Sequence, residues 1–202
     1  TMLRQPAVAG RFYRARQDEL LDDIRGFLQP VEPRAKVIGA IIPHAGYMYS
    51  GHVAGAVYAR IELPACNVIL CPNHTGLGAS LSIMRSGSWR TPLGEIRIDH
   101  ELAEALLNED PDLQDDIEAH RFEHAIEVQL PFIQHIAGPS TTFVPITIGA
   151  GGWSSLETLG RAMAEVLRKA DRTVLIVASS DMNHYESDAV TRVKDRKAID
   201  RV

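Results

Sequence analysis

The run Val37-Ile38-Gly39-Ala40-Ile41-Ile42, followed by Pro43 and His44, decides the fold of this 202-residue chain. Its length and branched apolar side chains are typical of a strand buried on both faces, and such strands occur in parallel sheets covered by helices. Pro43 ends the strand, and Gly46 permits an unusual turn or a close backbone approach. His44 is therefore expected at the edge of the sheet.

Two further apolar runs end in the same way. Val68-Ile69-Leu70-Cys71 leads through Pro72-Asn73 to His74, and Leu175-Ile176-Val177-Ala178 leads through Ser179-Ser180 to Asp181 and His184. If the three strands lie side by side, their imidazoles converge at the edge where open α/β sheets place their sites. Imidazole binds transition metals and transfers protons near neutral pH. His44 and His74 are thus candidate metal ligands, and His184 is a candidate general base.

Helical and strand patterns alternate along the whole chain. They predict helices near 17–28, after Ser50, after Asp99, near 124–136 and over 154–169, and strands over 37–42, 67–71, 81–85, 95–98, 142–148 and 173–178. Ser50, Asp99 and the Ser154-x-x-Glu157 capping box are expected to begin their helices, and Pro131 to kink or shorten its own. The alternation indicates one three-layer α/β/α domain over residues 1–202 with a mixed, mainly parallel sheet.

Composition narrows the class of protein. With 45% hydrophobic residues, 23% charged residues and a net charge of −5, the chain resembles an ordinary globular protein and lacks the basic surface that nucleic acid requires. No apolar stretch reaches the roughly 20 residues of a membrane span, so a cytoplasmic location and no membrane contact are expected. Cys66 and Cys71 lie five apart, which predicts buried reduced thiols.

Other polar residues allow two interpretations. His124 and Glu127 are three apart and could share a helix face in the pocket, although an exposed helix often has such residues. Asp181 either orients His184 or caps a short helix at Met182. The segment 109–120 is expected at the surface. Surface positions are also expected for the remaining histidines, namely His52, His100, His120 and His135.

Ser179, Ser180, Asp181 and His184 also invite a serine-hydrolase interpretation. The G-x-S-x-G elbow is absent, and triad members normally come from separated segments. This interpretation is disfavoured.

Several motifs together resemble the Memo family, whose prokaryotic members are called AmmeMemoRadiSam system protein B. They are Ile42-Pro43-His44-Ala45-Gly46-Tyr47, Pro72-Asn73-His74, Thr91-Pro92-Leu93-Gly94, Glu123-His124-Ala125-Ile126-Glu127-Val128-Gln129-Leu130-Pro131 and Ser179-Ser180-Asp181-Met182-Asn183-His184. The resemblance spans most of the chain in the expected order. It implies the fold of class III extradiol dioxygenases, enzymes that cleave catechol rings with non-haem Fe(II).

The resemblance also implies roles for individual residues. His44 and His74 would bind the metal, His184 would take the place of the dioxygenase base, and Asp181 would form the pocket wall beside His124. The family's third ligand is a cysteine downstream of the Ser-Ser-Asp motif, which neither cysteine of this chain matches. The domain is therefore expected to lack the family's C-terminal segment, and two histidines alone predict weak metal affinity. Fe(II) is the expected metal, with copper or zinc as alternatives.

These observations favour a metal-dependent, dioxygenase-like oxidoreductase of unknown substrate. The alternative is a non-catalytic module that recognises a peptide or partner protein on the same scaffold, and metal-assisted hydrolysis is a weaker possibility. The expected ligand is a small molecule or peptide. Family resemblance adds a radical SAM protein and an AMMECR1-type protein as expected partners.

Overall fold

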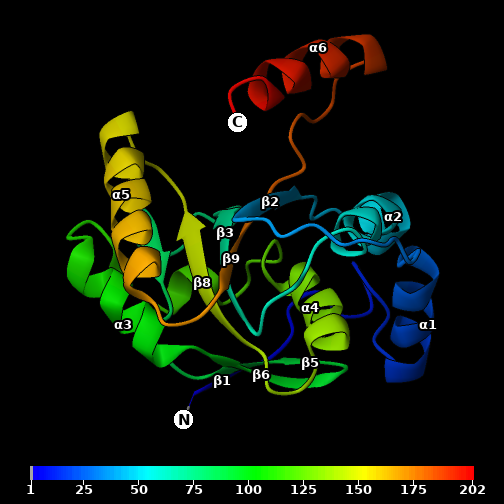
Figure 1. The fold of residues 1–202 in the computed structure, drawn as a ribbon, viewed down its shortest axis with the longest axis horizontal. Coiled ribbons are helices and arrows are strands. Elements are labelled where there is room, and N and C mark those ends of the chain that lie inside the picture. Colours follow the sequence, from blue (N-terminus) through cyan, green and yellow to red (C-terminus); the bar gives the residue numbers. More distant parts are fainter. Residues whose placement is uncertain (1) are drawn as a thin grey trace.

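The computed structural model describes residues 2–202, so Thr1, with which the predicted domain begins, lies outside the described residues. The strands of this part of the chain form one mixed, mostly parallel sheet with helices on both faces (Figure 1). The predicted three-layer α/β/α fold is confirmed.

The sheet has the strand order β1-β5-β6-β8-β3-β9-β2, and β4 and β7 extend it beside β8. Its middle strands β6, β8, β3, β9 and β2 are parallel, whereas β5 pairs with β6 and β4 with β8 in antiparallel fashion. The strands are β1 (Leu3–Arg4), β2 (Gly39–Ile42), β3 (Cys66–Pro72), β4 (Leu81–Ile83), β5 (Ser88–Thr91), β6 (Gly94–Ile98), β7 (Gln114–Asp115), β8 (Thr142–Ile148) and β9 (Val174–Ser179).

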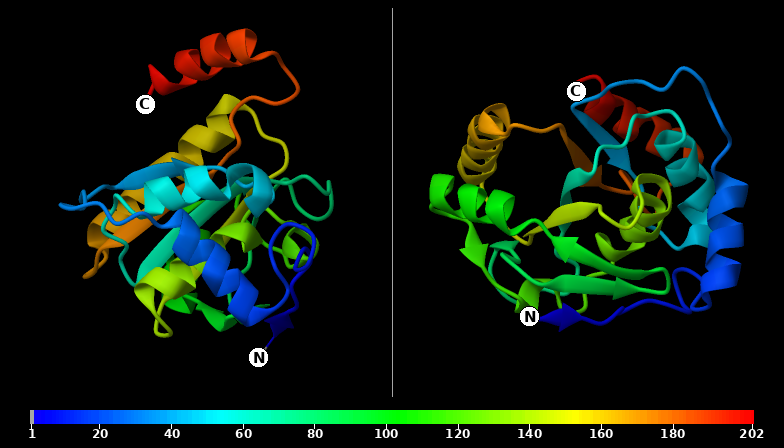
Figure 2. Two further views of the ribbon diagram at one scale, coloured as in Figure 1. Left: turned by 90° about the vertical axis from the view of Figure 1, so that its right-hand side faces the viewer. Right: turned by 60° about the horizontal axis from the view of Figure 1, so that its bottom comes forward.

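Two groups of helices cover the sheet (Figures 1 and 2). One face holds α3 and α5, and the other holds α1, α2 and α4, while α6 lies apart and has no buried residue. The helices are α1 (Gln17–Phe27), α2 (Tyr47–Tyr58), α3 (His100–Glu109), α4 (Leu130–Ala137), α5 (Trp153–Lys169) and α6 (Asp188–Ile199), with short 3-10 turns at Glu118–His120 and Glu127–Gln129.

The register of the parallel strands positions the candidate residues. β9 lies between β3 and β2, with Ala178 opposite both Leu70 and Ile41. Because the three strands run in the same direction, the segments that follow them all leave the sheet at its carboxyl edge. The predicted common edge is therefore confirmed for the segments that contain His44, His74 and Asp181.

Three local predictions about helices are wrong. The predicted helix 124–136 is divided into a 3-10 turn and α4. Pro131 lies in the first turn of α4, where the backbone N–H that proline lacks would have no partner within the helix. Ser50 lies inside α2, which begins after Gly46, and its hydroxyl donates to the carbonyl of Ala45. The Ser154 capping box does not form, because α5 begins at Trp153 without a side-chain cap.

Two other local predictions are confirmed. The carboxylate of Asp99 accepts a hydrogen bond from the backbone N–H of Leu102 and caps α3. Cys66 and Cys71 are free thiols, and both are buried. Among residues 2–202, no helix combines the length and apolar character that crossing a bilayer requires.

The prediction that His120 lies at the surface is wrong. Its side chain is fully buried, with Nε2 3.1 Å from the hydroxyl of Ser82 and its ring edge-to-face with Trp89. Burial lowers the pKa of His120 to about 3, so the imidazole is neutral. The many charged residues of segment 109–120 led to the surface prediction. The segment is nevertheless held against the core, because the side chain of Leu113 is buried there.

The packing of α2 on α1 yields a stability prediction. An added Cβ at Gly55 would lie 2.6 Å from both the Cβ and the carbonyl oxygen of Phe27, so Gly55→Ala forces the two helices apart. We expect a loss of about 1 to 3 kcal/mol in the free energy of unfolding. The matched control is Gly160→Ala at an exposed position of α5, where nothing lies within 4 Å of the new methyl group. The control should gain about 0.5 to 1 kcal/mol, and chemical denaturation measures both.

Candidate metal centre

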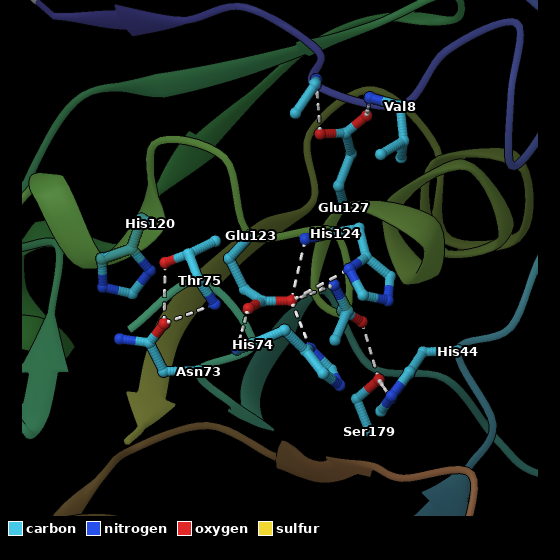
Figure 3. A network of polar contacts seen from close by, with 12 residues as sticks. Val8, His44, Asn73, His74, Thr75, His120, Glu123, His124, Glu127 and Ser179 are labelled. Carbon is cyan, nitrogen blue, oxygen red and sulfur yellow. Dashed lines mark hydrogen bonds and ion pairs between the residues drawn. The ribbon is translucent and has the colours of Figure 1, made fainter. Parts of the chain in front are cut away.

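Three imidazoles meet at the carboxyl edge of the sheet (Figure 3). His44 follows β2, His74 follows β3, and His124 precedes the 3-10 turn that leads into α4. One ligand nitrogen from each ring lies within 4.8 Å of those of the other two. The ring centroids of His74 and His124 are 4.6 Å apart, and His44 lies 5.2 Å from the first and 5.5 Å from the second.

Hydrogen bonds around Ser179 determine how His44 presents its nitrogens. The Ser179 hydroxyl donates to the carbonyl of Ala125 at 2.7 Å and accepts from Nε2 of Gln129 at 2.9 Å. Its only proton is thus engaged, so at 3.2 Å it accepts from Nδ1–H of His44. Nε2 of His44 is left unprotonated, with its lone pair available to a metal ion.

Glu123 determines which nitrogen of His74 is protonated (Figure 3). Its fully buried carboxylate accepts from Nδ1 of His74 at 2.9 Å and from the backbone N–H of His74, His124 and Ala125. A carboxylate only accepts, so Nδ1 of His74 holds the proton and Nε2 is free. A histidine ligand held by a carboxylate on its other nitrogen is a recurrent arrangement in metal sites.

His124 completes the cluster and borders the N-terminal loop. Its Nδ1 lies 3.3 Å from Oε1 of Glu123, and its ring contacts Phe12 with centroids 4.6 Å apart. One side of its imidazole therefore faces the two other histidines, and another is covered by an aromatic ring.

Asp181 and His184 follow β9 at the same edge. Oδ1 of Asp181 accepts from the backbone N–H of His44 and Ala45, and Oδ2 lies 3.7 Å from Nε2 of His44 and 3.5 Å from Nε2 of His184. Asp181 thus holds the loop after β2 and does not cap a helix. The His184 side chain is 51% exposed and lies at the rim. Met182 and Tyr185 adopt positive φ angles of 63° and 57°, a conformation that is rare for such residues.

The local environment leaves the buried imidazoles uncharged. Burial lowers the pKa of His44 and His124, and the opposing effects of Asp181 and Glu123 are smaller. Burial alone would raise the pKa of Glu123, but hydrogen bonds from His74 and Ala125 outweigh it and keep this pKa below its usual value. Neutral imidazoles beside an ionised carboxylate suit a cation.

Glu127 has no place in this pocket. Its carboxylate points away from the histidines (Figure 3) and accepts from Arg4, Tyr13 and the backbone N–H of Ala7 and Val8, without any exposed surface. The expectation that Glu127 could share a face with His124 is wrong, because residues 124–127 do not form an α-helix.

Sequence reasoning assigned no role to Glu123, Ser179 and Gln129. All three act through other residues, and the only sequence signal is the position of Glu123 beside His124 and of Ser179 two residues before Asp181. The serine-hydrolase interpretation gains no support, because the Ser179 proton is given to a backbone carbonyl.

The fold and the cluster define a three-layer α/β protein with a histidine site able to hold a metal ion. A family model described as Memo-like protein matches residues 4–202. MEMO1 family proteins of Pyrobaculum aerophilum and Methanopyrus kandleri are 41% and 42% identical over 212 and 214 residues, covering 99% and 100% of this chain and 75% and 76% of theirs. The counterpart in Methanosarcina barkeri is 40% identical over 201 residues, 99% of this chain and 75% of its own. The chain belongs to the Memo family.

Proposed function

We propose that the chain binds a metal ion, most readily Fe(II), through His44, His74 and His124, and that this centre serves an oxidation reaction. Copper and zinc are the alternative ions. The observation that supports the proposal is the convergence of three imidazoles, two of which have Nδ1 engaged and Nε2 free. Nitrogen ligands of this kind suit iron, copper and zinc.

The donor set fits such an ion. His124 would take the third donor position, since Cys66 and Cys71 are buried and do not belong to the cluster. A redox-active ion bound there would supply the electron transfer for oxidation of a substrate. His184 would hold or release a proton at Nε2, 3.5 Å from Asp181, and its exposed ring would exchange that proton with water.

Metal content after anaerobic loading with Fe(II) tests this proposal. We expect near-stoichiometric iron in the unaltered chain, almost none in His44→Ala or His74→Ala, and a clear loss in His124→Ala. His100→Ala is the matched control, because that exposed histidine lies at the start of α3, away from the cluster. Equal iron in all variants would refute binding at this site, and unchanged iron in His124→Ala alone would make His124 a wall residue.

Oxygen uptake by the loaded protein tests the reaction itself. Uptake in the presence of a phenol or reductant should disappear in His44→Ala and decrease in His184→Ala. Turnover that persists without oxygen would instead indicate metal-assisted hydrolysis.

A recognition module is the second candidate function. Large side chains on the segments that flank the histidines are exposed, with Met48 at 79%, Tyr49 at 73% and Tyr185 at 103% of their reference areas. Exposed aromatic residues favour contact with a peptide or protein. A radical SAM protein and an AMMECR1-type protein are the partner classes that we propose from the family resemblance. Binding that survives His44→Ala and His184→Ala would favour this function.

A further inference from the structure

Acidic side chains beside the histidine cluster lack basic partners. The carboxylates of Glu123 and Asp181 lie buried or nearly buried beside it, whereas Glu127, which points away from the histidines, is paired with Arg4. Glu123 and Asp181 have no ion pair with any lysine or arginine among residues 2–202. Their partners are backbone N–H groups and imidazoles.

The hydrogen bonds show that Glu123 is held as an anion. Its two oxygens accept three backbone N–H groups, from His74, His124 and Ala125, which favours the ionised carboxylate, and Nδ1 of His74 lies 2.9 Å from Oε1. Asp181 accepts two backbone N–H groups through Oδ1, while Oδ2 faces the imidazoles of His44 and His184. A buried anion without a cationic partner is costly, so the site is short of positive charge.

We propose that the fixed charges of Glu123 and Asp181 make the cluster select a divalent over a monovalent cation. This inference rests on the proposed metal binding and assigns both carboxylates as positioning residues with an electrostatic effect. Glu123 acts through the ring of His74, and Asp181 acts across the 3.7 Å gap to His44.

The inference differs from a purely structural role in a measurable way. The attraction between a fixed charge and a bound ion is proportional to the charge of the ion. Removing one carboxylate charge should therefore reduce the logarithm of the affinity about twice as much for a dication as for a monocation. Loss of orientation does not scale with the charge of the ion, and a variant that keeps the carboxylate but shifts its position measures that loss separately.

Copper is a suitable probe because Cu(II) and Cu(I) test both charges in one site. We would measure both affinities and the reduction potential of bound copper in a background with Cys66→Ser and Cys71→Ala, which removes competing thiols. Glu123→Gln removes the charge at constant size, and Glu123→Asp keeps the charge but shortens the reach. Asp181→Asn retains an oxygen acceptor for the N–H groups of His44 and Ala45. Glu157→Gln, on the exposed side of α5, is the remote control.

We expect Glu123→Gln and Asp181→Asn to weaken Cu(II) at least tenfold more than Cu(I), which raises the potential by about 59 mV for each factor of ten. Glu123→Asp should weaken both ions with little change in potential, and Glu157→Gln should change nothing. Equal losses for the two ions, with an unchanged potential in the charge-removing variants, would overturn the inference and leave metal binding intact.

Two further outcomes are distinguishable. If the unaltered chain binds neither ion, the proposed function fails and the inference fails with it. If circular dichroism shows that Glu123→Gln does not fold, Asp181→Asn decides, and an unchanged potential in that variant refutes the electrostatic effect.

Discussion

Replacing Glu127 with glutamine should lower the free energy of unfolding by about 3 to 5 kcal/mol. The carboxylate is fully buried and lies 2.7 Å from Nη1 of Arg4, whose side chain is only 6% exposed. Without the negative charge, the guanidinium is left as a buried cation without an ionic partner. The amide also has one acceptor atom for contacts that two carboxylate oxygens now satisfy, including those from Tyr13 and the backbone N–H of Val8.

Urea denaturation of Glu127→Gln at neutral pH measures this effect. The matched control is Glu157→Gln, which removes an ion pair with Arg161 on the exposed surface of α5 and should cost less than about 1 kcal/mol. A loss below 1 kcal/mol in Glu127→Gln would show that water or a local rearrangement satisfies Arg4.

The ion pair of Arg4 and Glu127 also connects the N-terminal segment to the histidine cluster. Arg4 also donates to the carbonyls of His120 and Glu123, and its guanidinium stacks on Trp89 at 4.0 Å. These contacts of Arg4 hold the loop that contains Glu123 and His124 in position. Stability and site geometry depend here on one buried ion pair.

The layered fold was predictable because its strongest signals are local. Continuous apolar runs predict strands, and Pro43 and Pro72 mark where two of them end. The prediction that the run 37–42 is buried on both faces is wrong, because β2 is the edge strand beside β9 and only Ile42 of its four residues is buried. Since parallel neighbours end at a common edge, the positions of His44, His74 and Asp181 followed once their three strands were assumed to be neighbours. Register and strand order were not determined by any single segment, because they depend on pairing between residues such as Ala178 and Leu70.

The loop from 118 to 129 was not predictable in the same way. Its charged residues resemble a solvated helix, yet His120, Glu123 and Glu127 are all fully buried. Each has a hydrogen-bond partner that is distant in the sequence, as in the contact of Arg4 with Glu127 across 123 positions. Periodicity records which side chains are apolar, but it contains no information on such long-range polar partners.

Replacing Ser179 with alanine should reduce metal affinity by about 10- to 100-fold, the usual effect of losing a group that orients a histidine ligand. Two tautomers of His44 compete in this site. Nδ1–H donates to Ser179 at 3.2 Å, whereas a proton on Nε2 would face Oδ2 of Asp181 at 3.7 Å. Without the hydroxyl, the second tautomer gains, and its Nε2 proton blocks the lone pair that a metal requires.

Nitrogen NMR of the metal-free chain tests this shift independently of metal binding. The resonances of His44 should indicate a proton on Nδ1 in the unaltered chain and on Nε2 in Ser179→Ala. Ser179→Thr keeps the hydroxyl and should keep the original tautomer, with most of the affinity. If Ser179→Ala retains the Nδ1 proton and full affinity, Asp181 does not compete for His44, and Ser179 contributes only to packing between β9 and Gln129.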